Sequence, residues 1–359
     1  MRIAFDATAA VRPQRTGIGW YAAHLARELT ASLEPRDALY VCTRLSRWKK
    51  RAFRPELGDA RAQQRWFQGW FGPLAVADVF HGPDGRLPGP RPTPLVATVS
   101  DVFSLVSDRF AAARFRARKR HRYRDIARRA RRIIFPSDAT RREYLEFFPE
   151  AEPRAAVVPH GVSPEFTVQT PEHVAAVRTR LGLPQRYALY VGEISVRKNL
   201  PGMARGLAAS GVALPWVWVG SDSFGAEPVL AAVREIPGVE VVRPGYVPFA
   251  DLPAVYAGAA VLTFATSHEG FGMPALEAMA CGTPVLVSDR GALPEVVGDC
   301  GLQAPPDDPG EIGAALRKLA HDEDLAASLR ARGLARAAEF SWQRTARETR
   351  AVYAAAISS

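Results

Sequence analysis

Short apolar runs rich in β-branched and aromatic residues recur along the chain, with helical stretches between them. Such alternation is typical of a doubly wound parallel sheet with helices on both faces. In the first half the pattern predicts strands at Arg2–Phe5, Leu39–Thr43, Val79–His81, Leu95–Ser100, Arg132–Pro136 and Ala156–Val158. In the second half it predicts strands at Tyr187–Val191, Trp216–Val219, Val239–Arg243, Val261–Phe264, Pro284–Ser288 and Gly301–Gln303. The sequence therefore predicts two similar α/β halves.

The chain of 359 residues is longer than a single hydrophobic core usually grows. We therefore expect two domains, 1–165 and 166–340, with the stretch 159–184 as the linker between them. Beyond these, Ser341 is a good helix cap, and the apolar residues after it fit one face of a helix. The segment 341–359 is expected to form a terminal helix that packs back on the fold.

Composition and charge narrow the class of protein. Hydrophobic residues make up 47% of the chain, which is ordinary for a folded globular protein. No window reaches about 18 uncharged apolar residues, and the start runs straight into a strand without an export signal. The three cysteines show no metal-ligand spacing and are too few for a disulfide framework. We therefore expect a cytoplasmic protein.

The net charge of +10 is distributed unevenly. Residues 1–165 carry 30 basic and 17 acidic side chains, and residues 166–359 carry 17 basic and 20 acidic ones. A basic half can attract nucleic acid, anionic lipid or phosphorylated substrates, and charge alone does not choose among these partners.

The segment from Ser267 to Asp289 joins a strand, a glycine loop, a helix and another strand. Gly270 and Gly272 allow the backbone to approach a ligand closely; Pro274 suits the first helical turn and Gly282 the position after the last. The amides of Phe271, Gly272 and Met273 are then expected at a helix N-terminus, which favours a diphosphate.

Two glutamates, Glu269 and Glu277, bracket this predicted anion site. Carboxylates accept hydrogen bonds from hydroxyl groups, so sugar and ribose hydroxyls on either side of a diphosphate are suitable partners. The alternative is that both acids merely complement the helix dipole.

This segment resembles the signature of the retaining glycosyltransferases of family four, which have the GT-B fold. Further similar segments are Thr16–Tyr21, Val79–Pro83, Val158–Val162 and Tyr190–Leu200, so the resemblance covers nearly the whole chain. It implies an α/β protein of GT-B type, with two Rossmann-like doubly wound domains facing a central cleft. The first domain would bind the acceptor and the second the nucleotide-sugar donor.

The resemblance also assigns roles to individual residues. Arg197 and Lys198 would neutralise the departing diphosphate, a change of charge that preorganised cations stabilise in the transition state. Gly17 would let the first-domain loop close over the diphosphate. Glu277 would hold the ribose hydroxyls, and Glu269 would lie near the transferred sugar.

The segment Arg243–Phe249, with Tyr246 and Val247, resembles the loop whose backbone meets the nucleobase, although the tyrosine can also simply pack. Two departures from the family pattern affect the donor site. Ser100 stands where many members have histidine, which leaves a hydroxyl in place of an imidazole near the sugar. Glu193 stands where arginine often follows the glycine, so either a phosphate contact is lost or Glu193 pairs with the basic residues.

The acceptor side gives weaker signals. The run Arg109–Arg124 and the segment Trp48–Arg51 combine basic and aromatic residues, and further aromatics follow at Trp66, Phe67, Trp70 and Phe71. This combination suits an anionic membrane surface that carries a lipid-linked acceptor. The alternative is a solvated arginine-rich helix with aromatics that cover the sheet.

The resemblance implies a retaining hexosyltransferase. No Asp or His cluster shows metal-ligand spacing, so we expect the enzyme to need no metal ion and no cofactor. The Arg-Lys-Asn form of the phosphate loop resembles mannosyltransferases of O-antigen assembly, which favours GDP-mannose as donor. A UDP-glucose or UDP-N-acetylglucosamine transferase is the alternative. A basic nucleic-acid-binding protein is the alternative outside enzymes, and we expect no nucleic-acid partner. The expected acceptor is a glycan or a lipid-linked glycan, and the enzyme would be peripheral on the inner face of the plasma membrane.

Overall fold

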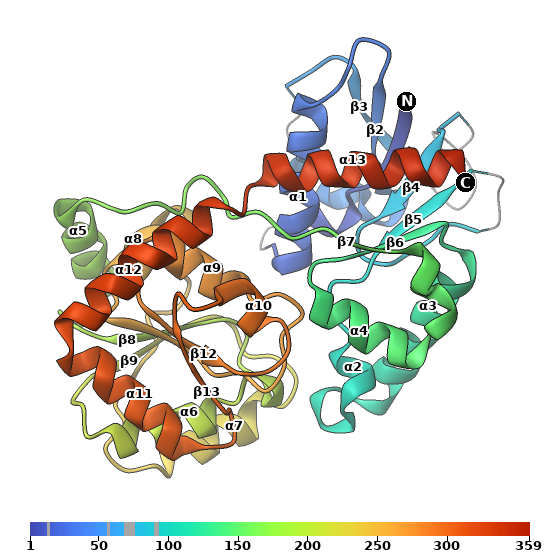
Figure 1. Ribbon diagram of the computed structural model, residues 1–359. Coiled ribbons are helices and arrows are strands. Elements are labelled where there is room, and N and C mark those ends of the chain that lie inside the picture. The colour runs from blue at the N-terminus through green and yellow to red at the C-terminus, as the bar shows by residue number, and fades with distance from the viewer. Residues whose placement is uncertain (13–14, 56–57, 68–75, 90–92) are drawn as a thin grey trace. The chain divides into compact units, whose positions relative to one another are not determined.

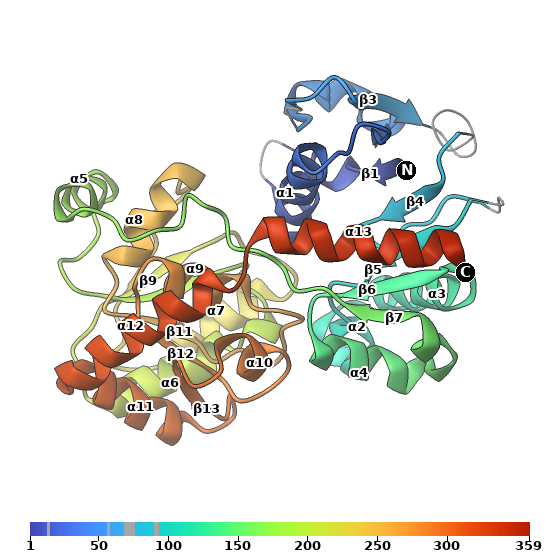
Figure 2. The same ribbon diagram turned by 45° about the horizontal axis from the view of Figure 1, so that its top comes forward.

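The computed structural model describes residues 1–12, 15–55, 58–67, 76–89 and 93–359, and these form two compact units. Unit 1 comprises residues 1–106, 114–161 and 340–359, and unit 2 comprises residues 107–113 and 162–339. Each unit holds one parallel sheet with helices packed on it, as Figures 1 and 2 show from two directions. The predicted fold class, two doubly wound parallel α/β halves, is confirmed.

Unit 1 is built on a sheet with the strand order β3-β2-β1-β4-β5-β6-β7. Its strands are β1 (Arg2–Asp6), β2 (Ala38–Arg44), β3 (Ala62–Phe67), β4 (Val79–Gly82), β5 (Leu95–Thr98), β6 (Arg132–Phe135) and β7 (Ala155–Val157). Its helices are α1 (Gly17–Ala31), α2 (Phe103–Val106), α3 (Ala113–Arg129), α4 (Asp138–Phe147) and α13 (Trp342–Ser358). Its 3-10 turns are η1 (Thr8–Ala10), η2 (Leu45–Phe53) and η5 (Pro149–Arg154), whereas η4 (Asp108–Phe110) belongs to unit 2.

Unit 2 is built on a sheet with the strand order β10-β9-β8-β11-β12-β13. Its strands are β8 (Ala188–Val191), β9 (Trp216–Val219), β10 (Val241–Val242), β11 (Val261–Phe264), β12 (Val285–Ser288) and β13 (Leu302–Ala304). Its helices are α5 (Pro171–Leu181), α6 (Leu200–Ser210), α7 (Ala226–Arg234), α8 (Leu252–Ala257), α9 (Met273–Ala280), α10 (Leu293–Val297), α11 (Pro309–His321) and α12 (Glu323–Ala338), with 3-10 turns η6 (Val196–Lys198) and η7 (Phe249–Asp251).

The strands form where the sequence has continuous apolar runs, because a parallel sheet is covered on both faces. Strands β4, β5, β9, β11 and β12 are buried along their whole length. Every strand predicted from the apolar pattern is present, with ends that shift by up to two residues. Strand β3 was missed because it is the edge strand and carries polar residues, so that only its two ends, Ala62 and Phe67, are buried.

The stretch 159–184, predicted as a linker, contains helix α5. Thr170 caps this helix by accepting a hydrogen bond from the His173 amide at 3.3 Å. The helix ends at Gly182, whose φ of 62° lies in the left-handed region that glycine adopts without strain.

Helix α13 follows unit 2 in the chain but packs in unit 1, against α1 and the sheet (Figures 1 and 2). Ser341 caps it, as predicted, by accepting from the Arg344 amide at 3.2 Å. In the core of unit 1, the Tyr353 hydroxyl contacts His81 Nδ1 at 2.7 Å. Gly161 is required where the chain meets this helix, because a Cβ there would come within 2.2 Å of the Trp342 nitrogen.

Candidate active site

The strand order of unit 2 reverses between β8 and β11. From β8 the chain proceeds to β9 and β10 on one side, whereas β12 and β13 follow β11 on the other. In open parallel sheets, ligands bind beyond the carboxyl ends of the strands at such a switch point. The loop after β8 carries Arg197 and Lys198, and the loop after β11 carries Glu269. The topology therefore brings two distant segments with predicted site residues to one place.

These three side chains form a buried charged cluster. The Lys198 ammonium lies 2.5 Å from Glu269 Oε1, and Arg197 NH1 lies 3.1 Å from the same oxygen. Their side chains are only 8% (Lys198), 11% (Arg197) and 10% (Glu269) exposed. Glu193 joins the cluster from a more exposed position, with its Oε1 3.3 Å from Arg197 NH2. Glu193 thus forms an ion pair with Arg197, one of the basic residues predicted as its partners.

The cluster sets the charge state of its members. Burial raises the pKa of Glu269, but Lys198 and Arg197 outweigh it and bring that pKa down to about 2. Burial and the neighbouring Arg197 lower the pKa of Lys198, and Glu269 opposes them. Glu269 is therefore a carboxylate at neutral pH, held by two cations.

Backbone contacts hold the loops of the cluster together. The Ser267 amide donates to the Arg197 carbonyl at 3.0 Å, and Arg197 NH1 donates to the His268 carbonyl at 2.7 Å. Asn199, with a φ of 54°, adopts the left-handed conformation, and its Nδ2 donates to the carbonyls of Ala265 (3.0 Å) and Pro306 (2.6 Å). Asn199 thus ties the loop after β8 to the loops after β11 and β13.

Helix α9 begins shortly after Glu269 in the sequence and carries the second predicted glutamate, Glu277. The helix begins at Met273, after Gly272 with a φ of 101°, and the chain leaves it at Gly282 with a φ of 74°. Glycine is required at both positive-φ positions. Glu277 lies in the second turn and accepts a hydrogen bond from the Tyr256 hydroxyl at 2.7 Å. Burial raises the pKa of Glu277 to about 7, and the Tyr256 hydrogen bond acts against this rise.

The remaining predicted donor residues lie on other loops. In unit 2, Tyr246 and Val247 follow β10; the Tyr246 side chain is 68% exposed, whereas Val247 is buried. The alternative that Tyr246 simply packs is therefore wrong. In unit 1, Gly17 is the first residue of α1, and Ser100 follows β5 in a partly exposed position. Gly270 and Phe271 lie between Glu269 and the start of α9, and Phe271 is buried.

Sequence reasoning missed the partners that fix these residues. Tyr256 pairs with Glu277 across 21 positions, and nothing in the sequence marks it. An asparagine directly before a proline-started helix, as at Asn199, is a signal that could have been used. His81, in the segment Val79–Pro83 that resembles a family motif, is fully buried, with Nε2 2.8 Å from the Thr98 hydroxyl and Nδ1 on Tyr353.

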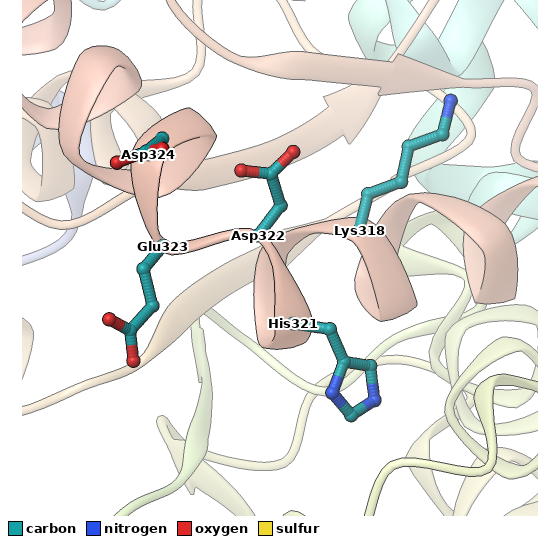
Figure 3. A pocket seen from close by; sticks show the side chains of 5 residues that line it. All are labelled: Lys318, His321, Asp322, Glu323 and Asp324. Carbon is teal, nitrogen blue, oxygen red and sulfur yellow. The ribbon is translucent and has the colours of Figure 1, made fainter.

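A hollow at the junction of α11 and α12 is a poor candidate for the site (Figure 3). It is lined by Lys318, His321, Asp322, Glu323 and Asp324. Asp322 already caps α12 by accepting from the Leu325 amide at 2.8 Å. Because α11 runs back from the carboxyl end of β13, this hollow lies toward the amino ends of the strands, the edge opposite the charged cluster.

Comparisons with known proteins give matches to both halves of the chain. Residues 15–166 match the family model described as Glycosyltransferase Family 4, and residues 185–322 match Glycosyl transferases group 1. The chain is 31% identical over 282 residues to the O-antigen chain mannosyltransferase B of Escherichia coli, which covers 76% of this chain and 72% of that protein. It is 29% identical over 227 residues to the serotype-specific mannosyltransferase WbdA of Escherichia coli, which is 61% of this chain but only 28% of that protein.

This chain belongs to the family 4, group 1 glycosyltransferases. The predicted enzyme class, a retaining hexosyltransferase, is confirmed at the level of the family. The fold of this glycosyltransferase is also that of Anabaena Alr3699/HepE, solved in complex with UDP-glucose, with a TM-score of 0.73, 16% sequence identity and 98% of both chains covered. No helix in the described part of the glycosyltransferase is long and apolar enough to cross a membrane.

Proposed function

We propose that this glycosyltransferase moves mannose from GDP-mannose to a hydroxyl group of a growing polysaccharide or lipid-linked glycan, with retention. The observation that carries the proposal is the buried Arg197–Lys198–Glu269 cluster at the switch point of the unit 2 sheet. The choice of mannose is supported by the similarity to mannosyltransferases of O-antigen synthesis.

Each residue of the proposed donor site has a chemical task. Arg197, Lys198 and the start of α9 would hold the diphosphate, since cations and helix amides both stabilise phosphate oxygens. Glu277 would accept hydrogen bonds from the ribose hydroxyls, and Glu269 from hydroxyls of the transferred sugar. The exposed Tyr246 and the Val247 backbone would meet the nucleobase.

Residues of unit 1 would complete the proposed donor contacts. Gly17 would contact the diphosphate, and the Ser100 hydroxyl would donate a hydrogen bond to the sugar. Both lie after strands β1 and β5 of unit 1, on the side of the sheet where its strands end. No metal ion or cofactor is needed in this proposal, because the two cations supply the positive charge.

The proposed reaction breaks the bond between the anomeric carbon and the diphosphate oxygen. The acceptor oxygen forms a new bond to the same carbon on the same face, and its proton passes to the departing diphosphate oxygen. Negative charge grows on the diphosphate as it leaves, so cations that are already in place lower the barrier.

A screen of nucleotide sugars tests the proposal. GDP-mannose at a hundred times its dissociation constant should stabilise the enzyme by about 2.7 kcal/mol, more than UDP-glucose or UDP-N-acetylglucosamine at equal concentration. Incubation with GDP-mannose and a mannose-terminated acceptor should then give an α-linked product. If only a UDP-sugar stabilises the enzyme, the donor is that UDP-sugar and not GDP-mannose. The similarity to the protein solved with UDP-glucose supports this alternative.

The pH dependence of donor binding tests the role of Glu277. Its pKa is raised to about 7 by burial, so half of the free enzyme carries a protonated Glu277 at that pH. Ribose hydroxyls favour the carboxylate, so donor affinity should rise as pH increases from 6 to 8, by up to about tenfold, and level off above. Calorimetry with the nucleotide sugar, whose phosphates are both esterified, measures this directly. Glu277→Gln should give a flat profile, and a flat wild-type profile would contradict the assignment.

Two glycines of α1 provide a matched pair of variants. A Cβ at Gly17 would meet no described atom within 4 Å, whereas one at Gly19 would lie 2.9 Å from the Ala9 carbonyl oxygen. Gly17→Ala should therefore leave the melting temperature unchanged but lower kcat/KM by about tenfold, because the methyl group would stand between backbone and diphosphate. Gly19→Ala should lower the melting temperature through overpacking. If Gly17→Ala keeps full activity, Gly17 does not approach the donor.

Most of the arginine-rich run lies in helix α3. One face of this helix packs on unit 1, and the other carries a row of exposed arginines, here called the basic stripe. Its inner face buries Tyr123, Ile126 and Ala127 against unit 1. Exposed basic residues follow its outer face at Arg114, Arg118, Arg120, Arg124 and Arg128.

Of the predicted aromatics, Trp48 is 50% exposed and Phe67 is buried, while Trp70 and Phe71 lie outside the described residues. We propose that this basic stripe contacts an anionic membrane bearing the acceptor, at the inner face of the plasma membrane.

Vesicle sedimentation tests the basic stripe. Each arginine near an anionic surface contributes about 1 kcal/mol, so changing Arg114, Arg118, Arg120 and Arg124 to Ser should weaken binding to anionic vesicles by at least about tenfold. Added salt should weaken wild-type binding as well. The matched control changes the exposed Lys318, Arg205, Arg234 and Arg330 of unit 2, which removes the same charge from elsewhere. Equal losses in both variants would show a general charge effect and no basic-stripe contact.

A further inference from the structure

This inference rests on the proposed function, under which a diphosphate would bind the same two side chains that Glu269 contacts. Glu269 Oε1 contacts both Lys198 Nζ (2.5 Å) and Arg197 NH1 (3.1 Å), the two groups assigned to the phosphate oxygens. Both cations thus already share a carboxylate that the protein itself supplies.

We propose that Glu269 is the internal counter-ion of the Arg197–Lys198 pair, and that it competes with the diphosphate for these cations. While the donor is bound, the sugar hydroxyls give the Glu269 carboxylate other partners, so the cations are released to the diphosphate. Once the sugar has moved to the acceptor, those hydroxyls are gone. Glu269 then returns to the cations and promotes release of the nucleoside diphosphate.

The exchange follows from the cost of burying charge. A buried cation without a partner is strongly unfavourable, so the Lys198 ammonium needs an anion in every state of the enzyme. Glu269 supplies that anion before binding and after transfer, and the diphosphate supplies it in between. While Glu269 lies on the cations it is a carboxylate, because Lys198 and Arg197 hold its pKa at about 2.

Close contacts fix the backbone of Glu269, so the proposed exchange requires a turn of its side chain alone. The Ala292 amide donates to the Glu269 carbonyl at 3.1 Å, and Gly291 packs so closely that a Cβ there would lie 2.9 Å from the same oxygen. Arg197 remains anchored on the His268 carbonyl, and the Lys198 ammonium lies 5.1 Å from the centre of the Phe264 ring. Both cations therefore keep their places when the carboxylate turns away.

Affinity for the free nucleotide product gives the test, because the competing charge is removed by Glu269→Gln. Calorimetry should show that this variant binds GDP or UDP, whichever the wild type binds, about tenfold more tightly than the wild type. Inorganic pyrophosphate should show the same direction of change. Glu277→Gln should change affinity in the opposite direction, since it removes an acceptor for the ribose. Glu193→Gln is the matched control: its carboxylate also faces Arg197 but is 45% exposed, so affinity should change by less than about twofold.

A second variant and a double-mutant cycle separate the possible failures. Glu269→Asp retains the charge and should bind the nucleotide as the wild type does, which guards against loss of fold in Glu269→Gln. In a Lys198→Met background, Glu269→Gln should tighten binding by much less, because the competition is for Lys198. Unchanged or weaker nucleotide binding by a folded Glu269→Gln overturns the counter-ion role. If Lys198→Met alone leaves nucleotide affinity intact, the donor site itself is wrongly placed.

Discussion

Replacement of Lys198 by Met is expected to slow sugar transfer by about a hundredfold or more, and Arg197→Ala to have a similar effect. Both cations would face the diphosphate as it gains charge, so their loss raises the barrier of the chemical step. Lys198→Met keeps the length of the buried stem, and Arg197 still pairs with Glu269 at 3.1 Å, so the fold should survive.

Single-turnover rates with saturating donor measure this loss without interference from product release. The matched control is Arg205→Ala, which removes an exposed cation from helix α6 and should leave the rate unchanged. Wild-type rates for both site variants, with a confirmed donor, would show that the loop after β8 does not bind the diphosphate.

Replacement of Glu269 and of Glu277 by Gln is expected to change different kinetic constants. Glu269→Gln should lower kcat by about a hundredfold, because its proposed partner is the sugar that changes during the reaction. Glu277→Gln should chiefly raise the KM for the donor, by about tenfold, with a small effect on kcat, because the ribose is bound equally in the ground and transition states. Steady-state kinetics of both variants with the same donor make the comparison. If both variants change KM alone, or both change kcat alone, the proposed division between sugar and ribose is wrong.

The sequence predicts this fold well because its strands are central and buried. Runs such as Val261–Phe264 can be predicted from the local sequence alone, since a parallel strand covered on both faces is apolar at nearly every position. The inner positions of strand β3 are partly or fully exposed to solvent, so its sequence is polar and resembles that of a loop. Helix α5 was missed for a different reason: only Val177 is buried in it, so its apolar periodicity is weak.

The site is only partly visible in the sequence. Glycines and a proline mark the start and end of α9, so the helix could be placed. The 71 positions between Lys198 and Glu269 hide their contact, because only the order of the strands in the sheet brings them together. The raised pKa of Glu277 depends on burial beside Tyr256, which no local pattern encodes.

The discontinuity of unit 1 affects how the protein folds during synthesis. Helix α13 supplies the Tyr353 hydroxyl for His81 and the Arg350 guanidinium for Asp37, at 2.7 Å in each case. A ribosome makes all of unit 2, residues 107–113 and 162–339, before these residues of α13 emerge. Unit 2 can therefore fold while unit 1 is still incomplete. Unit 1 is therefore completed only after unit 2, and the surface of α1 and of strands β4, β5 and β6 that α13 contacts stays uncovered until then.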